Sequence, residues 1–122
     1  MASYTELFAG SDTVTTATEE SCANNTTLTT AQTVTTDGHV QLVLDLNDMV
    51  DGDKLRVRFY EKVQSSGARR VFWAPIISDG PGEEKIMYFP VFQLMHGWDI
   101  TLEQIAGTAN IVIDWSIRSV TP

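Results

Sequence analysis

A chain of 122 residues is long enough for one domain with a single hydrophobic core. Hydrophobic residues make up 43% of it, which is too large a share for a disordered chain. The net charge of −8 argues against binding to nucleic acid or to an anionic membrane. No apolar run approaches the roughly 20 residues that span a bilayer, and no secretory signal is visible at the start of the chain. We therefore expect synthesis and folding in a cytoplasm.

The first third of the sequence is unusually rich in threonine. Between Thr13 and Thr36, 11 of 24 residues are Thr. This residue is β-branched, and its stiff side chain suits a half-exposed pleated sheet. The segment therefore predicts two exposed strands, near residues 11–21 and 26–36.

An alternative is that residues 1–36 form an ordered arm outside a main sandwich of residues 38–120. Such an arm would lie along a partner protein and pair with the edge of its sheet. The candidate contact residues on the arm are Thr13, Thr15 and Thr16. If the arm is separate, deletion of residues 1–20 should leave a folded domain.

From Gly38 onward, apolar and polar residues alternate with a period of two, which places the apolar residues of each strand on one face. Turn residues punctuate the runs about every 10 positions, a spacing typical of sandwiches and barrels. We predict an all-β fold: one β-sandwich over residues 1–122, jelly-roll-like, with about eight mostly antiparallel strands. The residues predicted to form its core include Leu55, Val57, Phe59, Trp98, Ile111, Ile113, Trp115 and Ile117.

Two prolines, Pro75 and Pro90, each interrupt an apolar run. Proline has no amide hydrogen to donate to a neighbouring strand. The strands that contain these prolines should therefore lie at sheet edges or be bulged. An open edge allows pairing with another chain.

Side chains with oxygen atoms cluster between two predicted strands, where they form the one candidate metal site. The cluster consists of Asp45, Asn47, Asp48, Asp51 and Asp53. Calcium prefers such ligands, but the spacing does not fit an EF-hand, and acidic turns are common for solubility alone. The single cysteine, Cys22, excludes an internal disulfide. We predict no metal, no cofactor and no enzymatic activity.

Other side chains are candidates for binding a partner. Arg69 and Arg70 form a local basic patch that could contact an acidic neighbour, such as another copy of this acidic chain, or could simply be solvated. Asp79 lies in a nearby turn and is a further candidate. The aromatic residues could form a sugar-binding platform, although aromatic side chains at strand spacing are more often core. They are Trp73, Tyr88, Phe89, Phe92, Trp98 and Trp115.

Several segments in the second half of the chain are similar to small virion proteins of tailed bacteriophages. The similarity covers roughly residues 54–120. It rests on Tyr60-Glu61-Lys62 before a Gly turn, Gly97-Trp98-Asp99-Ile100-Thr101-Leu102, Ala106-Gly107-Thr108 and the closing strand Asp114-Trp115-Ser116-Ile117-Arg118. The Thr-rich third does not contribute to it.

The resemblance implies a β-sandwich component of a phage particle, such as a head decoration (cement) protein. Such a protein binds the outer capsid lattice, stabilises the head and is made in the cytoplasm of the bacterial host. Its partner would be the major capsid protein or another virion protein, and it would form a homo-oligomer, a trimer or a dimer, on the particle. Alternatives are a tail, neck or baseplate component, and a carbohydrate-binding module.

Overall fold

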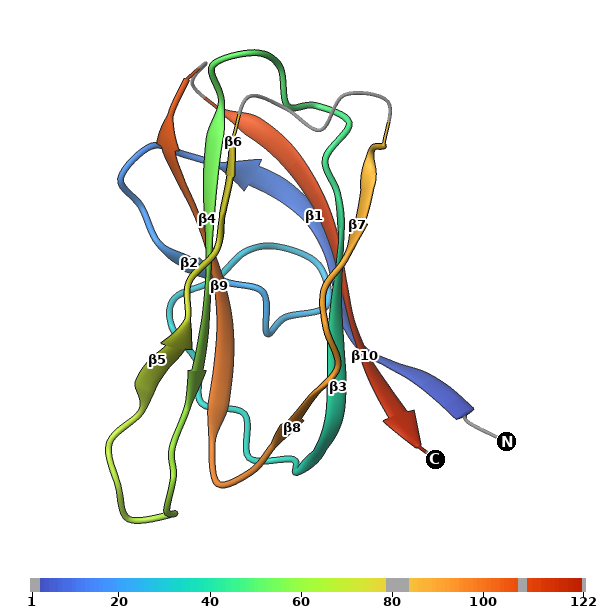
Figure 1. The fold of residues 1–122 in the computed structure, drawn as a ribbon, viewed down its shortest axis with the longest axis vertical. Helices are drawn as coiled ribbons and strands as arrows, with labels where there is room; N and C mark the ends of the chain where they lie inside the picture. Colours follow the sequence, from blue (N-terminus) through green and yellow to red (C-terminus); the bar gives the residue numbers. More distant parts are fainter. Residues whose placement is uncertain (1–2, 79–83, 108–109, 122) are drawn as a thin grey trace.

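The computed structural model describes residues 3–78, 84–107 and 110–121, and it consists of two five-stranded antiparallel sheets packed face to face (Figure 1). Sheet A contains β1 (Ser3–Val14), β10 (Ile111–Thr121), β3 (Gly38–Asp45), β7 (Ile86–Tyr88) and β8 (Phe92–Leu94). Sheet B contains β2 (Glu20–Ser21), β9 (Trp98–Ala106), β4 (Lys54–Glu61), β5 (Arg70–Trp73) and β6 (Ile76–Ser78). The predicted all-β sandwich is therefore confirmed. In the described part of the chain, no helix has the length and apolarity needed to cross a membrane.

Two of the edge strands are interrupted by the prolines. β5 and β6 both pair with β4, on either side of Pro75, and β7 and β8 both pair with β3, on either side of Pro90. This confirms the expectation that both prolines lie in edge strands. When each interrupted strand is counted once, eight strands remain, and successive strands change sheet except between β4 and β5/β6, an order consistent with a jelly-roll-like arrangement.

The core lies between the two sheets and is built from the inward-facing residues of the alternating strands. On β10, Ile111, Ile113, Trp115 and Ile117 are buried, while Val112 and Asp114 between them are exposed. All eight residues predicted for the core are buried. The period of two therefore identified the inner faces of β4 and β10 correctly.

Trp115 joins three parts of the chain that lie far apart in sequence. It pairs with Leu44 of β3 and with Gly10 of β1, and its indole Nε1–H donates a 2.9 Å hydrogen bond to the carbonyl of Cys22. A Cβ atom on Gly10 would overlap the Trp115 ring and would lie 2.7 Å from the Thr26 carbonyl oxygen. Only glycine leaves room at this position for the buried indole.

The Thr-rich segment belongs to the sandwich and is not a separate arm. β1 pairs with β10 from Ser3 to Val14, and its last residue is fully buried. Residues 15–36 then follow the free edge of β9 through short contacts, which are Thr16 with Gln104, Glu20 and Ser21 with Leu102 and Thr101, and Val34 with Trp98. This segment closes one side of the sandwich.

The prediction of two long strands near 11–21 and 26–36 is wrong. Regular pairing after Val14 is limited to Glu20–Ser21 and isolated bridges. The Asn24 side chain accepts a hydrogen bond from the Thr26 amide, which offers the backbone an alternative to a ladder at that point. Most of the other pairings of the segment are made with β9, which is remote in sequence. Deletion of residues 1–20 would remove β1, so we now expect the truncated chain to unfold.

Replacement of Trp115 by Ala tests the assignment of the core. The substitution leaves a cavity and an unpaired carbonyl at Cys22, so we expect the free energy of unfolding to fall by about 3–5 kcal/mol. The matched control is Val112→Ala on the same strand, whose side chain is 45% exposed. Urea denaturation measures both variants, and a loss below about 1 kcal/mol for Trp115→Ala would contradict the structure.

Candidate functional site: the open side of the sandwich

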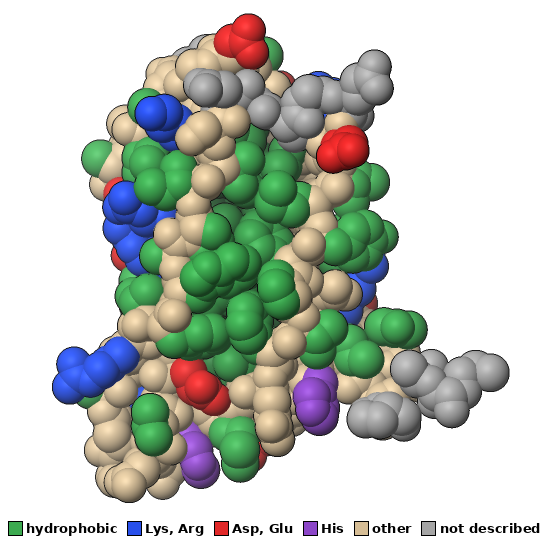
Figure 2. All heavy atoms as spheres, viewed as in Figure 1, with side chains coloured by type: hydrophobic (Ala, Val, Ile, Leu, Met, Phe, Trp, Pro, Cys, Tyr) green, Lys and Arg blue, Asp and Glu red, His purple; other side chains and the backbone are tan. Residues whose placement is uncertain are grey.

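The side of the sandwich opposite the Thr-rich segment is open. Here the β5/β6 edge of sheet B faces the β7/β8 edge of sheet A, and among the described residues no strand pairs with either edge (Figure 1). We call the surface between these two edges, within residues 70–78 and 84–95, the open side. Figure 2 looks onto it and shows hydrophobic side chains gathered between the two edges.

An aromatic cluster fills the space between the two edges. Ring centroids lie 5.1 Å apart for Phe72 and Phe92, 5.7 Å for Trp73 and Phe92, and 6.0 Å for Trp73 and Phe89. Phe59 lies beneath them at the centre of β4 and contacts all four. The two sheets are therefore held together here by ring contacts rather than by backbone pairing.

A bulge explains why two successive aromatic residues reach the cluster. Phe59 pairs with Trp73 and Tyr60 pairs with Val71, so Phe72 is an extra residue on β5. Side chains normally alternate between the faces of a strand, and a bulge re-aims one of them. Both Phe72 and Trp73 consequently contact Phe59 and Phe92.

Most of the exposed apolar surface of the molecule lies on the open side or on the strands that border it. Eight of the twelve exposed large hydrophobic side chains in the described residues fall between residues 71 and 95. They are Val71, Phe72, Trp73, Ile76, Ile86, Tyr88, Val91 and Met95. Single exposed apolar residues need no explanation, but a contiguous group is typical of an interaction surface.

The charge of the chain is distributed unevenly around this surface. Residues 54–95 carry seven of the eight Lys and Arg residues but only four of the sixteen Asp and Glu residues, a net charge of +3. The rest of the chain accounts for −11. Arg58 and Arg69 form ion pairs within the fold, whereas Arg70 on β5 is exposed and has no ion pair among the described residues. The open side is therefore an apolar surface with the exposed cation of Arg70 at its β5 edge.

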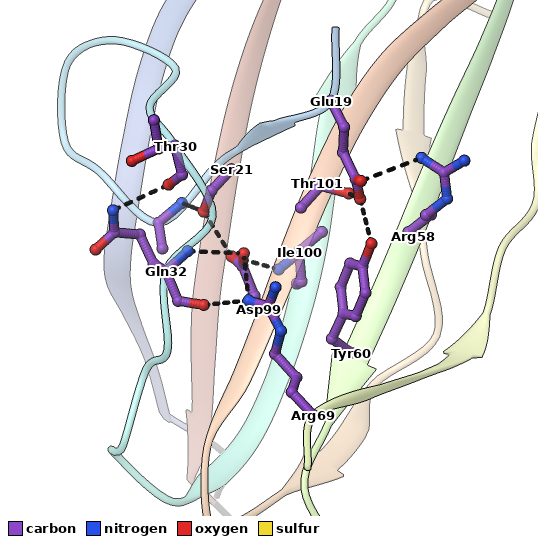
Figure 3. Close-up of polar contacts among 11 residues, drawn as sticks. Glu19, Ser21, Thr30, Gln32, Arg58, Tyr60, Arg69, Asp99, Ile100 and Thr101 are labelled. Atoms are coloured by element: carbon purple, nitrogen blue, oxygen red, sulfur yellow. Dashed lines mark hydrogen bonds and ion pairs between the residues drawn. The ribbon is translucent and has the colours of Figure 1, made fainter. Parts of the chain in front are cut away.

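On the side of the sandwich that residues 15–36 cover, a buried carboxylate joins this segment to β9 (Figure 3). The Asp99 side chain, on the outer face of β9, is fully buried. It accepts hydrogen bonds from Ser21 Oγ at 2.5 Å, from the Gln32 amide at 3.0 Å and from the guanidinium of Arg69 at 3.1 Å. Burial raises the pKa of Asp99, and these donors and the Arg69 charge oppose that rise.

A second carboxylate, that of Glu19, is anchored beside it. It accepts hydrogen bonds from the Thr101 hydroxyl and the Tyr60 phenol and lies 3.5 Å from the Arg58 guanidinium (Figure 3). Burial acts to raise the pKa of Glu19, but the donors and Arg58 outweigh it, so the pKa lies below its ordinary value. Both carboxylates thus bind the Thr-rich segment to β4 and β9, which is a structural role.

The structure places the candidate metal residues in separate contacts. Asp45 accepts a hydrogen bond from the Asn47 amide, Asp48 from the Val112 amide, and the buried Asp53 from the Val50 amide. Asp51 is exposed. In the described part of the chain, no three His, Cys, Asp or Glu side chains are arranged to hold an ion.

The partner-binding candidates also separate. Thr13 and Thr15 are half-buried, and Thr16 is exposed but bridges to β9. Arg69 is occupied by Asp99 and by the ring of Tyr60, 4.4 Å away, so the Arg69–Arg70 patch reduces to Arg70. Asp79 lies outside the described residues.

The aromatic residues considered as an alternative sugar platform do not form one exposed surface. Trp98, Trp115 and Phe89 are buried, whereas Trp73 and Tyr88 are exposed. The open side was not among the sites predicted from the sequence, although Pro75 and Pro90 marked its two edges. Nor was the Asp99 network predicted, for which a carboxylate inside an apolar run was the available signal.

A matched pair of neighbouring arginines tests the Asp99 network. Arg69→Met leaves a buried carboxylate without its cation, so we expect the free energy of unfolding to fall by about 1–3 kcal/mol. Arg70→Met, one residue away and exposed, should change it by less than about 0.5 kcal/mol. Equal losses in the two variants, measured by urea denaturation, would contradict the assigned role of Arg69.

The phenol of Tyr60 provides a spectroscopic test. Burial, together with the hydrogen bond and charge of Glu19, raises its pKa from 10.0 to about 12. The resulting stabilisation is fully present below pH 10 and is lost as the pH rises towards 12. Titration of phenolate absorbance should show the ionisation of Tyr60 as a step near pH 12, and Glu19→Gln should move the pKa of Tyr60 towards 10. An unchanged step in Glu19→Gln would show that the contact is absent.

Comparison of the chain with protein-family models, with curated proteins and with solved structures finds no match in any of the three.

Proposed function

We propose that this chain is a non-enzymatic structural protein of a phage particle that works by binding neighbouring protein subunits through the open side. The observation that carries the proposal is the exposed aromatic and aliphatic surface between β5/β6 and β7/β8 (Figure 2). Exposing apolar side chains such as Phe72 and Trp73 between the two edges is unfavourable for an isolated protein in water, and burial against another protein removes that cost.

The resemblance of residues 54–120 to small virion proteins of tailed phages supports a place on the particle. A head decoration protein that binds the outer capsid lattice is the first candidate, and a tail, neck or baseplate component is the second. The genome distinguishes the two: a neighbouring reading frame for the major capsid protein favours the head, and one for a tail tube favours the tail. A sugar-binding module receives less support, because Trp98 and Trp115 are core residues.

Reconstitution on particles tests the proposal. Particles are produced from a phage whose genome lacks the reading frame of this chain. They are mixed with the purified chain, and the bound copies are counted after sedimentation. Phe72→Ser should reduce the affinity by at least about tenfold, because it removes an apolar anchor from the centre of the open side. Val91→Ser, at a 46% exposed position, provides a second variant in case Phe72→Ser weakens the fold.

The control for both variants is Val63→Ser. This side chain is 85% exposed and lies between β4 and β5, so its loss removes a similar apolar group outside the open side. Its binding should match that of the wild type. Wild-type occupancy by both Phe72→Ser and Val91→Ser, or no binding of the wild-type chain at all, would overturn the proposal.

A further inference from the structure

A second exposed apolar surface lies on the outer face of sheet A. On β7, Met87 pairs with the buried Leu44 and faces the core, so Ile86 and Tyr88 on either side project outward. They are 58% and 61% exposed, and Val112 on the outward face of β10 is 45% exposed. A shallow groove of about 190 Å³ runs between β7, β3 and β10 across this face.

The outer face of sheet A carries carboxylates without a paired cation in the described part of the chain, whereas Arg70 at the flank of the open side is a cation without a paired carboxylate there. Asp45 of β3 and Asp114 of β10 lie directly opposite each other in register, an arrangement that is destabilising for like charges. Asp48 lines a second hollow on this face, together with Asp45 and Asp114. In the described part of the chain, no Lys or Arg forms an ion pair with any of the three. The nearby cation, Arg118, lies instead over the Tyr88 ring at 5.7 Å.

We propose that the open side binds a second copy of this chain, through the outer face of sheet A of that copy. The inference rests on the proposed function of the open side as a contact surface and names its occupant. Apolar side chains would meet apolar side chains, and Arg70 at the flank of one copy would approach Asp45 and Asp114 of the next. That approach relieves the repulsion between the two carboxylates while both apolar surfaces leave water.

The contact is heterologous, because two different surfaces of the chain meet. Such contacts form a ring where the rotation between copies closes and a linear chain where it does not. Each copy would therefore bind one neighbour with its open side and another with the outer face of its sheet A. This property makes the inference testable by complementation between two variants.

The experiment uses sedimentation velocity on the purified full-length chain over a series of concentrations. The wild type should associate as its concentration rises. Arg70→Glu damages only the open side and Asp114→Lys damages only the outer face, so each variant alone should associate at least about tenfold more weakly. Both residues are exposed, so neither change should disturb folding.

The equimolar mixture of the two variants gives the decisive result. The open side of the Asp114→Lys variant and the outer face of the Arg70→Glu variant are both intact, so their complex should form with wild-type affinity. Asp51→Lys, a charge reversal at an exposed turn residue, is the control and should associate as the wild type does.

Three outcomes would overturn the inference: a wild type that stays monomeric, single variants that associate normally, or a mixture that does not recover. In each of these cases, weaker particle binding by Phe72→Ser would still support the proposed function. The open side would then bind a different protein rather than a second copy of this chain. If the wild-type chain neither self-associates nor binds particles, both proposals are overturned.

Discussion

The fold depends on the buried carboxylate of Asp99. A charge removed from water is costly unless donors surround it, and the donors here come from Ser21, Gln32 and Arg69, which all lie 30 or more positions from Asp99 in the sequence. Satisfying one carboxylate therefore fixes the Thr-rich segment and the loop before β5 on the outside of β9. That segment in turn supplies the Cys22 carbonyl that accepts the Trp115 indole hydrogen bond.

The two sides of the sandwich are consequently different. One side is covered by residues 15–36, which pair with β9 and bury Cys22 and Leu28 in the core. On the other side, proline interrupts both edge strands, and an aromatic cluster joins the sheets while remaining partly exposed. Charge follows the same division, because the cations of the chain are concentrated in β4 to β8. This asymmetry is the physical basis of the proposed contacts with other subunits.

The sandwich and its core could be predicted because a period of two in residues such as Ile111 to Ile117 depends only on local alternation. The course of the Thr-rich segment could not, because it is decided by contacts with β9 that are remote in sequence, such as Ser21 with Asp99. The open side was signalled only indirectly, by Pro75 and Pro90. The exposure of Phe72 depends on a bulge, which composition does not reveal.

The account requires that the open side be covered in the working state of the protein. Hydroxyl-radical labelling of the wild-type chain, free in solution and bound on its particle, measures this directly, because Phe72, Trp73 and Met95 are exposed and oxidisable. The account predicts that all three lose labelling on the particle, while Tyr4, 67% exposed on the opposite edge strand, keeps it. Equal labelling of Phe72, Trp73 and Met95 in the free and bound chain would contradict it.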